Sequence, residues 1–403
     1  MRIAMIGTRG VPARYGGFET CVEEVGARLV DAGHDVVVFC RPSAGADRPR
    51  SYRGMSLVHL PALHKRSLET LSHTTLSVLH PALGRTDAAL VFNSANSPLL
   101  PVLRLRGIPV ATHVDGLEWM RSKWSGLGQR YYRVAESLAV RWSDALIADA
   151  PGIADYYAAE FGAATREIAY GAPITPKHDL HRLETIDLHP GKYHLVVARF
   201  EPENHVREIV EGYTRSTAEM PLVVVGSAPY AETYTESVHA AADDRVRFLG
   251  GLWDQELLDQ LYAGALTYLH GHSVGGTNPS LLRAAGAGAH AIAWDVRFNR
   301  EVLGDVADYF RTPSEAASLI EQAERDPARP SDLGLVLQQQ ITRYNWDDVA
   351  AAYEQLCVDL AESRRPSGIR RGGSMQETTA RLSARPEAAV PVDDLLELPT
   401  RAA

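Results

Sequence analysis

Short apolar runs alternate with segments of helical periodicity along the first half of the chain. The runs are bounded by polar residues or glycine, which is typical of strands that are buried on both faces of a sheet. Helical patterns begin at Gly17 and Gly128. This alternation predicts a parallel, doubly wound α/β sheet. The predicted strands cover residues 2–7, 35–40, 56–62, 88–93, 109–116 and 144–150.

A second series of strands, each followed by a helical pattern, begins after a polar, proline-containing stretch. These strands cover residues 193–200, 221–228, 246–251, 265–271 and 290–295. The last helix is predicted to begin at Trp346, with Asn345 as its N-cap. The Pro/Gly/Arg-rich segment that follows is expected to be disordered. The predicted organisation is an N-terminal domain over 1–172, a linker over 173–192, a C-terminal domain over 193–343, a C-terminal helix over 344–363 and a tail over 364–403.

The composition fits a globular protein with two cores and makes several functions improbable. At 403 residues, 45% of them hydrophobic, the chain is long enough for two domains. Its formal net charge of −9 argues against nucleic-acid binding, which needs a basic face. The three cysteines, Cys21, Cys40 and Cys357, are too far apart in sequence to suggest a zinc site or a disulfide framework. We expect a cytoplasmic protein without a membrane-spanning segment.

Two such domains would bind ligands where the carboxyl ends of their strands face each other. The segment GTRGVPARYGGFE follows the first strand, but the spacing of Gly7 and Gly10 is not that of a dinucleotide-binding fingerprint. A dehydrogenase is therefore not expected. Gly16 and Gly17 open the next helix, where backbone N–H groups can approach a phosphate. A plain tight turn is the alternative interpretation.

The segment GHSVGGTNPSLLRAAGAGA, residues 271–289, carries the strongest signal for anion binding. Its glycine pair, Gly275 and Gly276, precedes Thr277 and Asn278, and Pro279 is suited to the first turn of a helix. Backbone N–H groups of this loop and the positive end of the helix favour a phosphate. The alternative is a structural N-cap at Asn278.

Six segments together resemble a known family. IGTRGVPARYGGFET, LETLSH, VDGLEW, ARFEPEN, HGHSVGGTNPSLL and FNREVLGD occur in this order. From residue 1 to about 360 they resemble the rhamnosyltransferase-type branch of family-four glycosyltransferases. The resemblance implies the GT-B fold, in which two Rossmann-like domains face a cleft and the C-terminal helix crosses back to the N-terminal domain.

The same resemblance implies an activity. The expected reaction moves a hexosyl group, L-rhamnose from dTDP-L-rhamnose, to a hydroxyl of a sugar or lipid-linked glycan acceptor with retention of configuration. No metal ion or other cofactor is expected. Two alternatives from other classes are a nucleotide-sugar 2-epimerase and a non-catalytic nucleotide-sugar binder.

Two strand ends supply the predicted catalytic residues. The guanidinium of Arg199 can bind two phosphate oxygens and stabilise the leaving diphosphate; a surface ion pair with Glu201 or Glu203 is the alternative. Many family members carry a lysine five residues later, where this chain has Asn204. Asp115 is expected to accept a hydrogen bond from a substrate hydroxyl or to offset positive charge at the anomeric carbon. A capping aspartate is the alternative for that position.

Arg283 departs from the family pattern, because related enzymes place there a glutamate that is expected to accept hydrogen bonds from ribose. Arginine has donors only, so we expect weakened ribose recognition and low activity or an altered choice of donor. Recruitment of Arg283 as a phosphate ligand is the alternative. The predicted donor-binding residues are Gly16, Gly17, Arg199, Asn204, His272, Gly275, Gly276, Thr277, Asn278, Ser280, Leu281 and Arg283.

Loops of the N-terminal domain supply the acceptor-site candidates. These are Arg9, Arg14, Tyr15, Lys65, Arg66, Glu69, His73 and Asp115. His270 and His272 alternate as metal ligands can, but no carboxylate lies within the run, so hydrogen bonding near the donor sugar is favoured. Residues 117–142 combine four basic residues before Val134 with Trp119 and Trp124, which fits either peripheral contact with a membrane or a solvated helix face.

Overall fold

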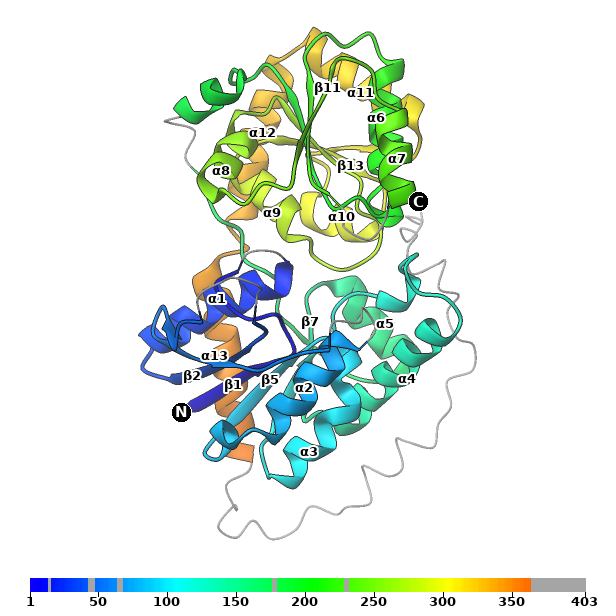
Figure 1. The fold of residues 1–403 in the computed structure, drawn as a ribbon. Helices are drawn as coiled ribbons and strands as arrows, with labels where there is room; N and C mark the ends of the chain where they lie inside the picture. The colour runs from blue at the N-terminus through cyan, green and yellow to red at the C-terminus, as the bar shows by residue number, and fades with distance from the viewer. Residues whose placement is uncertain (14–15, 43–47, 64–67, 176–179, 228–231, 364–403) are drawn as a thin grey trace, which may run out of the picture.

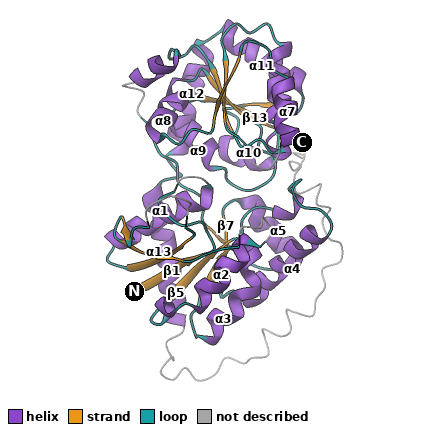
Figure 2. Ribbon diagram, in the orientation of Figure 1, coloured by secondary structure: helices purple, strands orange, loops and turns teal. Residues whose placement is uncertain are grey.

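The computed structural model describes residues 1–13, 16–42, 48–63, 68–175, 180–227 and 232–363. Two lobes, each built on a parallel sheet with helices on both faces, lie one above the other (Figure 1; Figure 2 shows the layers). The predicted tail lies outside the described residues. The predicted domain boundaries stay predictions.

The first sheet has the strand order β3-β4-β2-β1-β5-β6-β7-β8. All neighbouring pairs are parallel except β3 and β4. The structure confirms the strands predicted in this half and adds the short strands β3 and β8. The strands are β1 (Arg2–Ile6), β2 (Asp35–Cys40), β3 (Ser51–Tyr52), β4 (Met55–His59), β5 (Ala88–Phe92), β6 (Val110–His113), β7 (Ala145–Ala148) and β8 (Arg166–Glu167).

The second sheet has the order β11-β10-β9-β12-β13-β14 and is parallel throughout. Sequence patterns predicted all of its strands except the short β14. The strands are β9 (His194–Val197), β10 (Leu222–Val225), β11 (Val246–Gly250), β12 (Thr267–His270), β13 (His290–Trp294) and β14 (Asp308–Phe310).

Helices follow most of the strands, as the doubly wound pattern requires. The α-helices are α1 (Gly17–Asp31), α2 (Glu69–Leu79), α3 (Leu100–Leu105), α4 (Leu127–Trp142), α5 (Pro151–Phe161), α6 (Val206–Arg215), α7 (Glu232–Ala240), α8 (Gln255–Gly264), α9 (Pro279–Gly286), α10 (Arg297–Leu303), α11 (Pro313–Arg325), α12 (Ala328–Ile341) and α13 (Trp346–Ser363). The 3-10 helices are η1 (Pro81–Leu83), η2 (Ser94–Leu99), η3 (Glu118–Met120), η4 (His181–Ile186) and η5 (Pro202–Asn204).

Alternation of side chains along each strand fills both faces of the sheets. In β1, Ile3 and Met5 pack in the core under α1, whereas Ala4 and Ile6 pack in the core under α2 and α3. The second sheet is covered in the same way, by α6 and α11 on one face and by α8, α9 and α12 on the other. Both sheets are therefore buried on both sides, which accounts for their continuous apolar runs.

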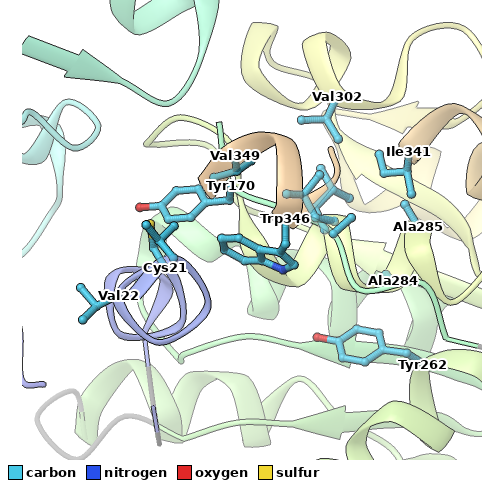
Figure 3. Close-up of a cluster of buried hydrophobic side chains, with 14 of the residues drawn as sticks. Cys21, Val22, Tyr170, Tyr262, Ala284, Ala285, Val302, Ile341, Trp346 and Val349 are labelled. Atoms are coloured by element: carbon cyan, nitrogen blue, oxygen red, sulfur yellow. The ribbon is translucent and has the colours of Figure 1, made fainter. Parts of the chain in front are cut away.

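The C-terminal helix α13 returns to the first domain and packs on α1, β5 and β6 (Figure 1). It begins at Trp346, and the side chain of Asn345 accepts a hydrogen bond from the N–H of Asp347, as expected for an N-cap. The indole of Trp346 lies in the apolar cluster between α1 and residues of the second domain (Figure 3). A Cβ at Gly171 would lie 2.2 Å from this ring, so the chain crosses tightly here.

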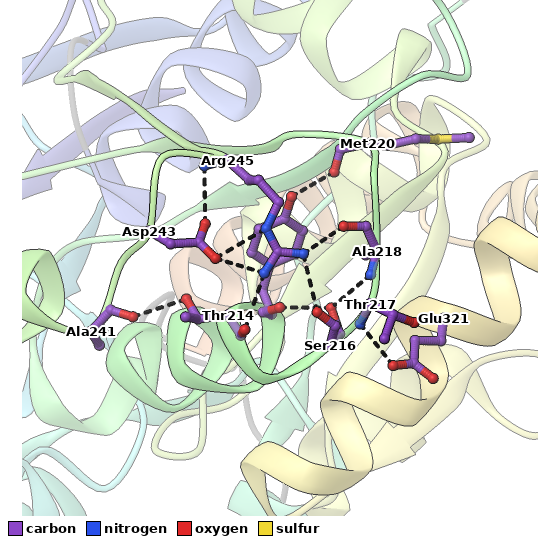
Figure 4. A network of polar contacts seen from close by, with 10 residues as sticks. Thr214, Ser216, Thr217, Ala218, Met220, Ala241, Asp243, Arg245 and Glu321 are labelled. Atoms are coloured by element: carbon purple, nitrogen blue, oxygen red, sulfur yellow. Dashed lines mark hydrogen bonds and ion pairs between the residues drawn. The ribbon is translucent and has the colours of Figure 1, made fainter.

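A polar network connects the end of α6 to the segment before β11 (Figure 4). The guanidinium of Arg245 pairs with Asp243 and donates to the backbone carbonyls of Thr214, Ser216 and Ala218. These carbonyls belong to the end of α6 and the turn after it, where helix geometry leaves acceptors without partners. Arg245 also precedes β11, so the network lies at the amino ends of the strands, opposite the candidate site. We assign it a structural role.

Candidate functional site

The candidate site lies where the carboxyl ends of both sheets meet. Asp115 follows β6 in the first domain, and Arg199 follows β9 in the second. A Cβ placed on Gly116 would lie 2.4 Å from Cα of Gly275, and one on Gly17 would lie 2.9 Å from Cγ of Pro279. The start of α1 and the loop before α9 therefore come together at the domain boundary.

The loop of residues 275–278, which we call the glycine loop, leads directly into α9. Asn278 is the N-cap of α9, and its Oδ1 accepts hydrogen bonds from the N–H groups of Ser280 and Leu281 at 2.9 and 3.4 Å. Asn278 thus acts as a structural N-cap, which was the alternative interpretation of this position. Because these helical N–H groups are already used, an anion would have to bind the N–H groups of the glycine loop itself.

Arg199, Asn204 and His272 form a connected group on the second domain. The amide of Asn204 donates to the carbonyl of Arg199 at 2.8 Å, and its Oδ1 lies 2.6 Å from Nδ1 of His272. The guanidinium of Arg199 lies 3.4 Å from Glu201, so the ion pair considered as an alternative is present. Burial, together with the charge of Arg121, lowers the pKa of His272 well below its usual value. The imidazole is therefore neutral and able to exchange hydrogen bonds with a sugar.

Asp115 has features of a capping aspartate and of a substrate-binding carboxylate, the two interpretations that the sequence left open. Its φ of 66° lies in the left-handed region, and its carboxylate accepts hydrogen bonds from the N–H of Gly116 and the amide of Asn93, both at 2.9 Å. It therefore caps its own turn. Burial and the charge of Glu118 raise the pKa of this carboxyl group to about 6. Such a perturbed acid at strained backbone is typical of a functional position.

A buried cluster of charges beside Asp115 was not predicted as part of the site. Nε of Arg121 lies 2.7 Å from Glu118, its Nη1 lies 4.0 Å from Glu201, and Ser122 donates to Glu203 at 2.8 Å. The last two contacts cross the domain boundary. They hold the strand ends of the two domains together.

Two of the four basic residues that precede Val134 in segment 117–142 are thus not on a solvated face. Arg121 is almost fully buried, and Lys123 pairs with Glu118 at 3.1 Å. The other two basic residues, Arg130 and Arg133, belong to α4. Contact of this segment with a membrane stays a prediction, and no helix within the described ranges has the length and apolar character needed to cross a bilayer.

The structure pairs the side chain of Arg283 with α8. Its Nε lies 2.7 Å from Oδ1 of Asp259, and its remaining nitrogens donate to the side chain and carbonyl of Gln255 at 2.9 and 3.1 Å. All of these acceptors belong to α8, and the guanidinium also lies over the ring of Tyr262. The positive charge of Arg283 is therefore paired within the second domain, which does not favour its recruitment as a phosphate ligand.

The acceptor-site candidates are only partly brought to the domain boundary. The N–H of Arg9 donates to Glu19 on α1, which lies beside Gly16, whereas Glu69 on α2 pairs with Arg41. His73 is fully buried, and burial lowers the pKa of its imidazole to about 4. This agrees with a core position for His73. The candidates Arg14, Tyr15, Lys65 and Arg66 lie outside the described residues.

The residues of the HGH segment are buried among polar and aromatic groups. His270 lies 3.2 Å from the hydroxyl of Tyr268, and burial holds the pKa of its imidazole far below the usual value. Among the residues that the structure describes, His, Cys, Asp and Glu side chains form no group of three that could hold a metal ion. The three cysteines are free and buried.

Asp149 is a further acidic residue of this region that sequence reasoning missed. It follows β7 directly, and only 3% of its surface is exposed. The hydroxyl of Thr277 donates to its backbone carbonyl at 2.5 Å. The rule that selected Asp115, an acidic residue at the carboxyl end of a buried strand, would also have found Asp149.

Comparison with known proteins gives a match to one domain family and several structures of the same fold. Residues 16–171 match the model of the glycosyl transferase 4-like domain. A search of curated protein sequences found no match. The solved structures that are similar to this chain share its fold at low sequence identity.

Three of these structures illustrate the likeness. Sucrose-phosphate synthase from Thermosynechococcus elongatus is 19% identical with a TM-score of 0.77, and the match covers 90% of this chain and 99% of that one. HepE from Anabaena, solved in complex with UDP-glucose, is 17% identical with a TM-score of 0.73, over 89% of this chain and 100% of that one. An α,α-trehalose-phosphate synthase (UDP-forming) from Burkholderia xenovorans, in complex with glucose-6-phosphate, is 14% identical with a TM-score of 0.64, over 89% and 100%.

The two parallel sheets, their facing strand ends and the returning helix α13 agree with these comparisons over nearly the whole chain. Residues 16–171 thus match a glycosyl transferase 4-like domain, and the chain as a whole has the GT-B fold.

Proposed function

We propose that this protein is a glycosyltransferase that moves a hexosyl group from a nucleoside-diphosphate sugar to a hydroxyl of a sugar or lipid-linked glycan, with retention of configuration. The observation that carries the proposal is the meeting of Asp115, Arg199 and the glycine loop at the domain boundary. A cation and a row of loop N–H groups suit a diphosphate. The carboxylate suits a hydroxyl or the positive charge of the transition state.

In the proposed mechanism, the N–H groups of the glycine loop bind the diphosphate and Arg199 stabilises the charge that develops on it as the glycosidic bond breaks. Asn204 orients His272 beside that loop through the 2.6 Å contact. A Cβ at Gly275 would lie 3.0 Å from Nε2 of His272, so the ring lies beside the glycine loop. A sugar attached to a diphosphate on this loop would be within reach of the imidazole. We expect no metal ion in this mechanism, because Arg199 and the loop supply the positive charge.

The donor is proposed to be dTDP-L-rhamnose on the basis of the resemblance to the rhamnosyltransferase-type branch. UDP-glucose is the competing donor, because HepE, which shares the fold, was solved with it. The protein is further proposed to act in the cytoplasm, with peripheral contact at the inner face of the membrane if the acceptor is lipid-linked.

A donor screen tests the proposal. Thermal unfolding would be followed with dTDP, UDP, dTDP-L-rhamnose and UDP-glucose, and we expect stabilisation by at least one nucleotide sugar. The stabilising donor would then be incubated with the protein in the absence of any acceptor, and the sugar would be analysed. Conversion to an epimer would identify a nucleotide-sugar epimerase instead, and the absence of stabilisation by any nucleotide would contradict the proposal.

A further inference from the structure

Asp149 carries a buried carboxylate whose bonding is incomplete. Only 3% of the residue is exposed, and Oδ1 has no hydrogen-bond partner within the described part of the chain. A buried polar oxygen without a partner is rare and costs roughly 1 to 3 kcal/mol. The carboxylate belongs to the first domain but lies against the glycine loop of the second. Oδ1 is therefore an unused hydrogen-bonding atom at the boundary between the two domains.

Gly276 shows that the carboxylate and the loop are fitted to each other. Unlike Gly275, whose φ is 142°, Gly276 does not have a left-handed φ, so its backbone conformation does not require glycine. A Cβ on Gly276 would instead lie 2.0 Å from Oδ1 and 2.8 Å from Oδ2 of Asp149. The missing side chain makes the room that the carboxylate occupies. Glycine is therefore required at position 276 because any side chain there would clash with the carboxylate of Asp149.

The backbone of Asp149 also contacts the glycine loop. Thr277 is 5% exposed, and its hydroxyl donates to the carbonyl of Asp149 at 2.5 Å. Across the loop, Gly116 approaches Cα of Gly275. The glycine loop is thus enclosed by the strand ends after β6 and β7, and Oδ1 of Asp149 lies beside the N–H groups that the proposed function assigns to the diphosphate.

The charge of this carboxyl group decides which part of a donor it can contact. Burial and the nearby Asp115 raise the pKa of Asp149 to about 8, so proton loss near neutral pH is unfavourable in this site. An ionised carboxylate would repel a diphosphate, whereas the neutral acid could donate a hydrogen bond to it, so the diphosphate suits only one of the two forms. A hydroxyl can donate to the carboxylate or accept from the neutral acid, so it pairs with either form. A nucleoside-diphosphate sugar carries hydroxyls on the transferred sugar at one end of the diphosphate and on the ribose at the other. Because the ribose is expected near position 283 on α9, the hydroxyls of the transferred sugar are the ones left for Asp149.

We propose that Asp149 is a specificity-determining residue that hydrogen-bonds a hydroxyl of the transferred sugar, while the glycine loop binds the diphosphate. This inference rests on the proposed function. It predicts that Asp149 distinguishes a nucleotide sugar from the corresponding nucleotide, because only the former carries the hydroxyl. Residues that act on the diphosphate would affect both ligands.

Isothermal titration calorimetry with UDP, UDP-glucose, dTDP and dTDP-L-rhamnose tests this difference. For the preferred nucleotide sugar, Asp149→Ala is expected to weaken binding about tenfold, which corresponds to about 1.4 kcal/mol. Binding of the matching nucleotide should change less than about twofold, a difference of about 0.4 kcal/mol. Asp149→Asn, which retains an oxygen acceptor of similar size, should recover part of the affinity. Asp31→Ala, at an exposed carboxylate on α1, is the matched control.

Gly276→Ala provides a second test that leaves Asp149 in place. Its Cβ would displace the carboxylate, and because Gly276 is also part of the loop that binds the diphosphate, binding of both ligands should weaken, that of the nucleotide sugar by the larger factor. An equal loss of affinity for nucleotide and nucleotide sugar in Asp149→Ala would overturn the inference in favour of a role in positioning the loop, and unchanged affinities would overturn it as well. Wild-type protein that binds none of the four ligands would contradict the proposed function itself.

Discussion

Replacing Arg283 by glutamate tests how α9 contributes to the donor site. In the structure the guanidinium is paired with Asp259 and Gln255 on α8, and 20% of its side chain is exposed against 36% for Asp259. Ion pairs with this degree of exposure stabilise proteins by about 1 kcal/mol or less. Arg283→Glu loses that contribution and places two carboxylates near each other, so we expect a modest decrease in the melting temperature without loss of the fold.

The expected gain is in turnover. A carboxylate at position 283 is proposed to accept hydrogen bonds from the ribose hydroxyls, which arginine cannot do. One charge-assisted hydrogen bond corresponds to about 1.4 kcal/mol, or about a tenfold higher rate. Initial rates would be measured with dTDP-L-rhamnose and with UDP-glucose for wild type and Arg283→Glu. Arg283→Met, which removes the pairing with α8 without adding a carboxylate, is the control and should leave both rates near those of wild type.

The alternative role of Arg283 gives the opposite result. If the arginine leaves Asp259 when the donor binds and contacts a phosphate, both Arg283→Glu and Arg283→Met should abolish activity with both donors. That outcome would refute the reasoning from the observed ion pair. Turnover by neither wild type nor variant, with nucleotide binding intact, would instead favour a non-catalytic binder.

Three further predictions concern other parts of the account. Arg199→Ala should weaken nucleoside-diphosphate binding and turnover by about 2 kcal/mol or more in calorimetric and rate measurements, and unchanged values would remove it from the site. Burial raises the pKa of Asp115 to about 6, so its ionised form is lost as the pH falls through 6 and kcat/KM should decline below that pH. Asp115→Asn should lower kcat more than donor affinity and should remove this acidic limb of the pH profile. Retention of the limb would assign it to another group. Trp346→Ala should lower the free energy of unfolding by about 3 to 5 kcal/mol in a denaturant titration, and a change below about 1 kcal/mol would contradict its place in the shared core.

The alternation of apolar runs with helical patterns made the two sheets predictable from the sequence. Their principal strands are continuous apolar runs because both faces are buried, and the N-cap at Asn345 marked the start of α13. The strands β3, β8 and β14 were missed because two or three residues are too few to show a period. They also lie at the edges of the sheets, where burial constrains composition less.

The candidate site was only partly predictable for a different reason. Asp115, Arg199 and the glycine loop each follow a strand, so the topology alone brings them together. The partner of Arg283 depends on how α8 packs against α9, and the contact between Arg121 and Glu201 depends on how the domains meet. No local pattern encodes such contacts. The role of Gly276 became clear only from the distance between its missing Cβ and Asp149.

Product analysis with an acceptor tests the central claim most directly. The protein would be incubated with dTDP-L-rhamnose or UDP-glucose and a lipid-linked glucose acceptor, and the products would be analysed by mass spectrometry, with Arg199→Ala as the control. The account predicts an acceptor that has gained one hexosyl or deoxyhexosyl unit, nucleoside diphosphate released in equal amount, and much less of both with the variant. Nucleotide-sugar binding without an extended acceptor across a panel of donors and glycan acceptors would contradict it.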